Sequence, residues 1–377
     1  MEKIKICHIT TVHPSRYDIR IYEKECRSLA KAGYDVHLIV NDFKDDEVKD
    51  GVTIHSLHTK AKNRFDRSSR IAKLALAKAL EIDASVYHLH DPELLKIGVK
   101  LRKKGKKVIF DSHEFTAMQI RTKPWIPTQF LRNFLSNRYR NYEKRKLRKL
   151  SGLVVPCTYD NEDYFKEVNI LKEYIANYPS RDSFSFDNNQ KKEKKMCYVG
   201  SVTILRGFNR MVEVAGIAKI PLVLIGDYSD ITEEQMNAIK DKPGYQFLEF
   251  KGIMSHADTL KENSKCSVGL CLLQKTGQYE HIDTLPTKAY EYMGLGVPTV
   301  ISDFPYCQRV LDKYQFGYCA DPGDAEAIAK AVLSIVDGNV KEMAEAGKKA
   351  ILEEFNWENE ANKLAAFYKK VLDIKEK

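Results

Sequence analysis

Several features that define other protein classes are missing from this sequence. No stretch approaches the roughly 18 apolar residues that a membrane-spanning helix needs, and the opening MEKIKICHIT has no apolar core of signal-peptide length. The eight cysteines form no Cys-x-x-Cys pair, and several lie in apolar runs such as CSVGLCLL. These absences predict a cytoplasmic protein whose cysteines are reduced and buried.

Signatures of dinucleotide and nucleic-acid binding are missing as well. No Gly-x-Gly-x-x-Gly follows the first expected strand, which argues against a dehydrogenase. Zinc-finger spacings and aromatic RNA-binding motifs do not occur, so nucleic acid is not an expected partner. The net charge is nevertheless +9, with strongly basic segments at 100–107 and 138–149. Such a surface attracts other anions, for example anionic lipid or a phosphorylated substrate.

Short β-branched strands alternate with helices in two parts of the chain. The expected strands are KIKICHIT, YDVHLIV, SVYHLH, KVIFD and GLVVP, and then MCYVG, PLVLIG, YQFLEFKG, SVGLCLL and PTVIS. Continuously apolar strands of this kind form parallel sheets covered on both faces. The sequence therefore predicts an α/β protein with two Rossmann-like doubly wound domains at 1–181 and 196–356, joined by a polar linker at 182–195 and closed by a helix at 357–377.

The segment EHIDTLPTKAYEYMGLGVPTVIS is the most informative loop of the second part. Its proline is expected near the first turn of a helix, where backbone amides stabilise a phosphate. The residues expected at this entrance are Thr284, Leu285, Pro286, Thr287 and the positively charged Lys288. Glu291 lies one turn further along. It could bind the two hydroxyls of a ribose, or it could simply stabilise the N-terminus of the helix.

A second loop, YVGSVTILRGF, follows the first strand of the second part. The strand is expected to end at Gly200, and the turn through Ser201 leads to Arg206 and Gly207 before the next helix. Ligands of doubly wound sheets bind beyond the carboxyl ends of the strands. Arg206 could therefore clamp a diphosphate, although a surface arginine before a helix is as common.

Together the two loops resemble the retaining family 4 glycosyltransferases, which have the GT-B fold: two Rossmann-like domains face each other across a cleft and a C-terminal helix crosses back to the first. The most specific part is the pattern P-x-K-x-x-E-x-M-x-x-G-x-P from Pro286 to Pro298. The resemblance covers nearly the whole chain and looks like the branch that builds bacterial surface polysaccharides such as capsule, O-antigen or exopolysaccharide. It implies a retaining hexosyltransferase that uses a UDP- or GDP-sugar and a glycan or polyprenyl-diphosphate-linked acceptor, with no metal or other cofactor.

The resemblance also implies roles for individual residues. Glu291 would bind the ribose of the donor, and Ile253 would lie near the base. Asp283 would contact hydroxyls of the transferred sugar. His113, in FDSHEF at the end of a first-domain strand, would lie near the sugar and its leaving phosphate.

Three positions depart from the family pattern. Asp283 stands where the family usually has Glu, and Ser201 stands where many members have Arg. The resemblance therefore leaves the diphosphate to Arg206, Lys288 and the loop amides. The loop after the first strand, TTVHPSRYDIR, has polar residues instead of a glycine pair.

Polar residues at strand ends of the first domain are assigned to the acceptor or phosphate side. They are His13, Arg16, Asp18, His90 and Asp91. Asp18 is also expected to cap the following helix. Histidine and aspartate can bind zinc, but Asp91 before Pro92 favours a helix cap. Because no Asp-x-Asp occurs either, no metal site is predicted.

The region between Trp125 and Lys149 combines aromatic and basic residues. Trp125, Ile126, Phe130 and Phe134 look exposed, and the helix after them is crowded with Arg and Lys. Such a helix can lie on an anionic bilayer, which would suit a lipid-linked acceptor. An ordinary solvated helix face is the alternative.

Two other functions remain open at this point. One is a catalytically silent subunit that binds a sugar nucleotide within a glycosyltransferase complex, and the other is a GT-B nucleotide-sugar epimerase. The sequence does not specify the sugar, the base or the acceptor, since these depend on the shape of the pocket.

Overall fold

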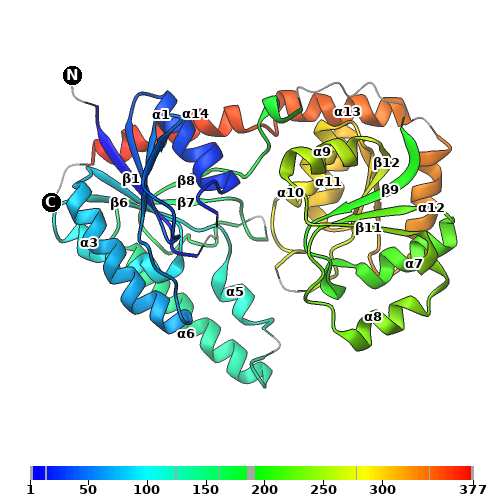
Figure 1. Cartoon of the computed structure of the whole chain (residues 1–377), viewed down its shortest axis with the longest axis horizontal. Coiled ribbons are helices and arrows are strands. Elements are labelled where there is room, and N and C mark those ends of the chain that lie inside the picture. Colours follow the sequence, from blue (N-terminus) through cyan, green and yellow to red (C-terminus); the bar gives the residue numbers. More distant parts are fainter. Residues whose placement is uncertain are drawn as a thin grey trace. The chain divides into compact units, whose positions relative to one another are not determined.

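The computed structural model describes residues 3–12, 15–123, 125–160, 162–184, 192–276, 278–338 and 340–374. The chain divides into two units, one formed by Met1–Asn177 with Glu358–Lys377 and the other by Tyr178–Trp357. Figure 1 shows that each unit is a sheet with helices packed around it. The dividing points lie close to the domain limits expected at 181/182 and 356/357.

Unit 1 contains an eight-stranded sheet in the order β3-β4-β2-β1-β5-β6-β7-β8, in which β3 alone is antiparallel to its neighbour. The strands are β1 (Lys5–Ile9), β2 (Asp35–Val40), β3 (Glu47–Lys49), β4 (Val52–Ser56), β5 (Val86–Leu89), β6 (Lys107–Asp111), β7 (Gly152–Val155) and β8 (Leu171–Tyr174). The central strands β1 and β5 pair in a register that places His8 beside His88.

Helices cover this sheet, and α14 from the end of the chain is one of them. The helical elements of unit 1 are η1 (Ile19–Cys26), α1 (Arg27–Lys31), α2 (Arg64–Asp66), η2 (Arg67–Ile71), α3 (Ala72–Ile82), η3 (Pro92–Leu94), α4 (Leu95–Arg102), α5 (Thr116–Ile120), α6 (Gln129–Leu147) and α14 (Trp357–Leu372). Leu364, Phe367, Tyr368 and Val371 of α14 are fully buried. A Cβ on Gly152 of β7 would lie 2.8 Å from the Phe367 ring, so only glycine lets α14 pack this closely. The expectation of a closing helix that returns to the first domain is confirmed.

Unit 2 contains a six-stranded, fully parallel sheet in the order β11-β10-β9-β12-β13-β14. The strands are β9 (Glu193–Val199), β10 (Leu222–Ile225), β11 (Leu248–Gly252), β12 (Cys266–Cys271), β13 (Thr299–Ser302) and β14 (Gly317–Ala320). The helical elements are η4 (Arg181–Phe184), η5 (Ile204–Arg206), α7 (Phe208–Ala218), α8 (Glu233–Lys240), η6 (Pro243–Phe247), α9 (His256–Ser264), α10 (Thr287–Gly294), α11 (Pro305–Tyr314), α12 (Ala325–Val336) and α13 (Val340–Glu353).

Apolar residues cover both faces of the unit 2 sheet. One cluster joins the strands to α7 and α12 through residues such as Met211 and Val332. Separate clusters join the strands to α9, α10 and α13 through residues such as Leu260, Met293 and Ile351. This is the doubly wound arrangement that the continuously apolar strands predict.

The ten expected strands all occur, whereas β3, β4, β8 and β14 were not expected. Strands β3 and β8, EVK and LKEY, carry charged residues and lack the apolar run that marks a buried strand. In β4, VTIHS, polar residues interrupt the apolar ones, and β14, GYCA, is only four residues long. The linker expected at 182–195 ends in β9, and 185–191 lie outside the described residues. All eight cysteines are free and seven are buried, as expected. Within the described ranges, no helix is long and apolar enough to cross a membrane.

Candidate active site

Two cations meet at the carboxyl end of β9. A Cβ built on Gly200 would lie 3.4 Å from both the Nη1 of Arg206 and the Nζ of Lys288. Lys288, in the first turn of α10, is 9% exposed, and its Nζ lies 3.6 Å above the centre of the Tyr198 ring. No described residue accepts a hydrogen bond from this ammonium. The strand end is therefore a small, positively charged cradle.

The electrostatics of Lys288 favour an anionic ligand. Burial, and after it the neighbouring Arg206 charge, lower the pKa of Lys288 to about 8. A buried ammonium that lacks a partner costs free energy. An anion placed beside Gly200 would remove that cost, because it would pair with Lys288 and Arg206 together.

Gly207 fixes the position of Arg206. It has φ +87°, and a Cβ there would lie 2.3 Å from the backbone oxygen of Leu272. The Oγ1 of Thr203 caps the short helix η5 by accepting from the Arg206 amide at 3.2 Å. Ser201 takes part through its backbone, since its carbonyl accepts from the Tyr198 hydroxyl at 2.8 Å.

The entrance of α10 differs in one respect from the expectation. The Leu285 amide donates to the Tyr290 hydroxyl at 3.0 Å, and the Thr284 hydroxyl lies 3.2 Å from the same oxygen. The expectation that the Leu285 amide faces a phosphate is therefore wrong, because Tyr290 occupies it. Pro286 does precede the helix, which leaves the first-turn amides of Thr287 and Lys288 for an anion.

Glu291 has a partner that the sequence did not identify. Its Oε1 lies 2.9 Å from the Nε2 of His256, the first residue of α9. Ile253 precedes α9 in the same loop and is 78% exposed. A carboxylate, an imidazole and an exposed apolar side chain thus border the same side of unit 2 as the cationic cradle, since Glu291 lies one turn beyond Lys288.

Asp283 also has an unexpected partner. Its Oδ1 accepts from the Nη2 of Arg309 on α11 at 2.6 Å. The Asp283 side chain is only 15% exposed, whereas Arg309 is 47% exposed. A single arginine in an amphipathic helix gives no sequence signal of this pairing, because α11 lies 20 residues or more further along the chain.

Unit 1 has a cavity of about 1500 Å³. Four of the predicted site residues line it: Asp18, His90, Asp91 and His113. Basic side chains line it as well, among them Arg20, Arg64, Lys96, Lys123, Arg138 and Arg145. Asp18 caps η1 as expected, since its Oδ1 accepts from the amides of Arg20 and Ile21 at 2.9 Å. The cavity is large enough for a sugar or lipid-headgroup ligand.

His113 lies at the wall of this cavity. Its Nε2 is 3.1 Å from the Oδ2 of Asp111 and 3.1 Å from the Nδ1 of His90. Arg20 binds Asp111 through two nitrogens, at 2.9 and 3.1 Å. Burial opposes ionisation of Asp111, but the Arg20 charge and the contacts with His113 and His90 together outweigh it and hold the pKa of Asp111 well below its usual range. An ionised, buried carboxylate therefore orients the His113 ring.

Other first-domain expectations need correction. Arg16 is 3% exposed and binds Asp42 through two nitrogens, at 2.7 and 2.9 Å, so its guanidinium is already neutralised. Asp91 is the N-cap residue of η3 and Pro92 begins this helix, as expected, but the Asp91 side chain makes no capping hydrogen bond. It accepts instead from the amide of Thr11 at 2.5 Å and from the hydroxyl of Thr10 at 3.1 Å, because these donors follow β1 directly. His13 lies outside the described residues.

The aromatic segment that runs from Trp125 into the first turns of α6 is mostly exposed. Trp125 is 66%, Phe130 82% and Phe134 49% exposed, as expected. Ile126 is 2% exposed, so the expectation of its exposure is wrong. The Ile126 side chain is buried at the wall of the unit 1 cavity.

Two family models match the chain. The model described as Glycosyltransferase Family 4 matches residues 23–173, within unit 1. The model described as Glycosyl transferases group 1 matches residues 180–353, within unit 2. No curated protein sequence is similar enough to count as a match.

Solved structures with the same fold span the full length of the chain. Sucrose-phosphate synthase from Thermosynechococcus elongatus is 17% identical with a TM-score of 0.76, covering 98% of this chain and 99% of its own. A glycosyltransferase from Rickettsia africae is 14% identical with a TM-score of 0.72, covering all of both chains. The Anabaena protein HepE, solved with UDP and glucose, is 12% identical with a TM-score of 0.67, covering 97% and 99%. The chain is therefore a glycosyltransferase of the GT-B fold, with a family 4 domain in unit 1 and a group 1 domain in unit 2.

Proposed function

We propose that the protein is a retaining glycosyltransferase that transfers a hexose-type sugar from a UDP- or GDP-sugar to a glycan or lipid-linked glycan during surface polysaccharide synthesis. The observation that carries the proposal is the buried, unpaired ammonium of Lys288 beside Arg206 and Gly200. A nucleotide diphosphate supplies the negative charge that this cradle lacks. The UDP and glucose bound to HepE support the same class of donor.

The roles of the unit 2 residues follow from the chemistry of a nucleotide sugar. Arg206, Lys288 and the first amides of α10 would neutralise the leaving diphosphate, which is the main electrostatic task in glycosyl transfer. Glu291, joined to His256, would bind the ribose, and Ile253 would lie against the base. Because two cations and a helix N-terminus already serve the diphosphate, we propose that donor binding needs no metal.

The unit 1 cavity would bind the acceptor, with His113 at its wall near the reacting sugar. Helix α6 lines this cavity with Tyr139, Tyr142 and Arg145 and exposes Phe130 to solvent. One helix thus borders the cavity and presents an aromatic surface. This arrangement supports a lipid-diphosphate-linked acceptor and peripheral contact with an anionic membrane.

A donor screen tests the proposal directly. UDP- and GDP-sugars are added to the purified protein, and the thermal midpoint and slow donor hydrolysis are measured. The expected result is stabilisation and hydrolysis by one nucleotide class, with both lost in Glu291→Ala and Arg206→Ala. Survival of both in these variants would disprove the site. Donor binding without any hydrolysis or transfer would point to a catalytically silent subunit.

The stereochemistry is tested separately by NMR of the transfer product. Retention of the anomeric configuration is expected, with the leaving phosphate accepting the proton of the acceptor. An inverted product would overturn this mechanism while leaving the donor site intact.

Donor affinity is expected to fall above about pH 8. The diphosphate binds protonated Lys288, whose pKa in the free protein is about 8. At higher pH each binding event must take up a proton, so Kd should rise by up to about tenfold per pH unit. Titration calorimetry between about pH 7 and 9 measures this slope. In Lys288→Arg the charge persists throughout this range, so a slope that remains in this variant would contradict the assignment to Lys288.

Membrane contact is expected to depend on the aromatic end of α6. Double replacement Phe130→Ser/Phe134→Ser should lower binding to anionic vesicles at least about tenfold, since each ring removed from the bilayer forfeits about 1.5–3 kcal/mol. Co-sedimentation with vesicles of graded anionic content measures the effect. Phe43→Ser is the matched control, because Phe43 is 68% exposed elsewhere on unit 1. Binding that ignores both the anionic content and the two phenylalanines would rule this contact out.

A further inference from the structure

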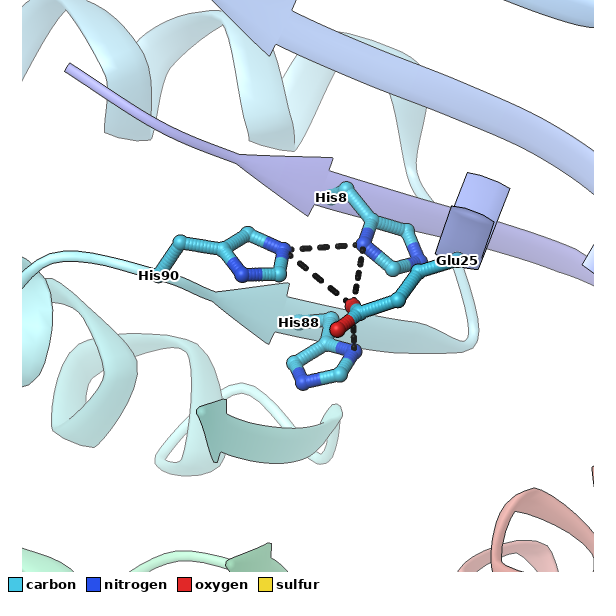
Figure 2. A group of neighbouring side chains, drawn as sticks. All are labelled: His8, Glu25, His88 and His90. Atoms are coloured by element: carbon cyan, nitrogen blue, oxygen red, sulfur yellow. Dashed lines mark hydrogen bonds and ion pairs between the residues drawn. The ribbon is translucent and has the colours of Figure 1, made fainter. Parts of the chain in front are cut away.

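Three histidines and a glutamate meet inside unit 1, away from solvent. His8 lies on β1, His88 lies on β5 and His90 directly follows β5, while Glu25 lies on η1 (Figure 2). Their exposed fractions are 0% for His8, His88 and Glu25, and 3% for His90. The β1–β5 register explains the grouping. His8 pairs with His88, and His90 projects from the same face two residues later.

The side-chain atoms converge on one point. The Oε2 of Glu25 is 3.8 Å from the Nδ1 of His8, 3.8 Å from the Nδ1 of His88 and 3.9 Å from the Nε2 of His90. The His8 and His90 nitrogens are 2.9 Å apart, and all four atoms lie within 4.8 Å of one another. Tetrahedral zinc ligands at their usual bond lengths are about 3.3 Å apart. Small side-chain shifts would therefore bring four ligands around one ion.

The outer nitrogens of two rings have the partners that metal-bound histidines need. The Nε2 of His8 lies 3.1 Å from the Tyr368 hydroxyl. The Nδ1 of His90 lies 3.1 Å from the Nε2 of His113 and 3.6 Å from the Asp111 carboxylate. Such contacts fix the tautomer that leaves the inner nitrogen free to coordinate.

The carboxylate of Glu25 lacks compensation in this environment. No described residue donates a hydrogen bond to either of its oxygens, and its only close cation is Arg20, whose Nε is 3.2 Å away. Arg20 also neutralises Asp111. Two buried carboxyl groups thus share one guanidinium, and the Oε2 of Glu25, which faces the three histidines, is available to a metal ion.

We infer that His8, Glu25, His88 and His90 form a structural site for a divalent transition metal of the zinc type. The ligand set is imidazole and carboxylate, which suits Zn²⁺ or Co²⁺ and not Ca²⁺ or Mg²⁺. All four positions would come from protein, so the ion would tie β1, β5 and η1 together and would not take part in sugar transfer. This departs from the expectation of no metal, which rested on the residues around Asp91 and on the absence of an Asp-x-Asp motif.

In the metal-free protein, Tyr368 occupies one of the nitrogens that would bind the metal. Its hydroxyl is 2.9 Å from the Nδ1 of His88, the nitrogen that would coordinate. In the metal-free protein this bond closes a hydrogen-bonded chain from His113 through His90, His8 and Tyr368 to His88. Metal binding would break the His88–Tyr368 bond and leave Tyr368 with His8.

The test is the metal content of the full-length chain, purified without a polyhistidine tag. We expect about one equivalent of tightly held Zn²⁺ per chain by mass spectrometry of the metal. Protein refolded with Co²⁺ should show the visible absorption of tetrahedral Co²⁺. Removal of the metal should lower the thermal midpoint while the affinity of unit 2 for its donor stays unchanged. A folded chain that takes up neither ion, as purified or after refolding, overturns the inference.

Two variants locate the ion. Glu25→Gln removes one ligand with little change of shape and should lower metal affinity at least about tenfold. His55→Gln is the control, because His55 and His37 form a second imidazole pair at 2.9 Å that is partly exposed. Loss of metal in His55→Gln with retention in Glu25→Gln would place the ion at the wrong histidines and refute the site.

Discussion

Replacement of Lys288 by methionine is expected to lower kcat/KM by about 10²–10³-fold, the usual effect of removing one donor that stabilises a leaving group's charge. The side chain that remains has similar length and is apolar, so the packing against Tyr198 is kept. The same change should leave the ligand-free protein as stable as before or more stable, because it removes a buried ammonium that has no hydrogen-bond partner. Loss of function combined with unchanged or increased stability is the signature of a site built for a charged ligand.

A second buried lysine provides a matched control. The Lys192 ammonium also has a pKa lowered to about 8, chiefly by burial, but it donates to the carbonyls of Ser264 at 2.7 Å and Leu295 at 3.2 Å. Lys192→Met should therefore lower stability, since it leaves two carbonyls unsatisfied, while donor affinity stays unchanged. Thermal unfolding with and without the donor measures both variants. If Lys288→Met destabilises the free protein as Lys192→Met does, Lys288 has a structural role instead.

The sequence predicted the ten strands that carry a clear apolar run and missed β3, β4, β8 and β14. It also placed Gly200, Arg206, Lys288 and Glu291 correctly at one edge of unit 2, since loops after parallel strands gather there. It could not predict the partners His256 and Arg309. His256 lies on α9 and Arg309 lies on α11. The apolar pattern of each helix predicts which of its faces is buried, but not which residue of another segment its polar side chains contact.

The interior of unit 1 shows the same limit more strongly. His88 lies on β5 and His90 directly follows it, and this spacing of two residues predicts that both rings face the same side. The meeting with His8 depends on the β1–β5 register, and the meeting with Glu25 depends on how η1 packs over the sheet. Neither contact can be predicted from the sequence of a single strand or helix. Arg16 was misjudged for the same reason, because its partner Asp42 follows a different strand.

Replacement of Arg20 by methionine is expected to destabilise unit 1 by about 3–5 kcal/mol, the cost of removing one partner from a buried ion pair. Arg20 is 6% exposed and compensates both Asp111 and Glu25. Its loss leaves Asp111 as an uncompensated buried carboxylate. Hydrogen exchange of the β1, β5 and β6 peptides measures the loss, with unit 2 peptides as an internal reference that should not change.

Two further variants and the pH separate this explanation from simple loss of packing. Arg27→Met, in the adjoining helix α1, removes an arginine whose ion pair with Glu23 is about one-third exposed, and it should cost at most about 1 kcal/mol. Arg20→Met/Asp111→Asn removes the stranded charge and should recover a large part of the loss. In Arg20→Met, the folded pKa of Asp111 would lie above its unfolded value of about 3.9, so protonation stabilises the variant as pH falls. The deficit should therefore be smaller at about pH 5 than at about pH 7.5, whereas a packing defect would be independent of pH.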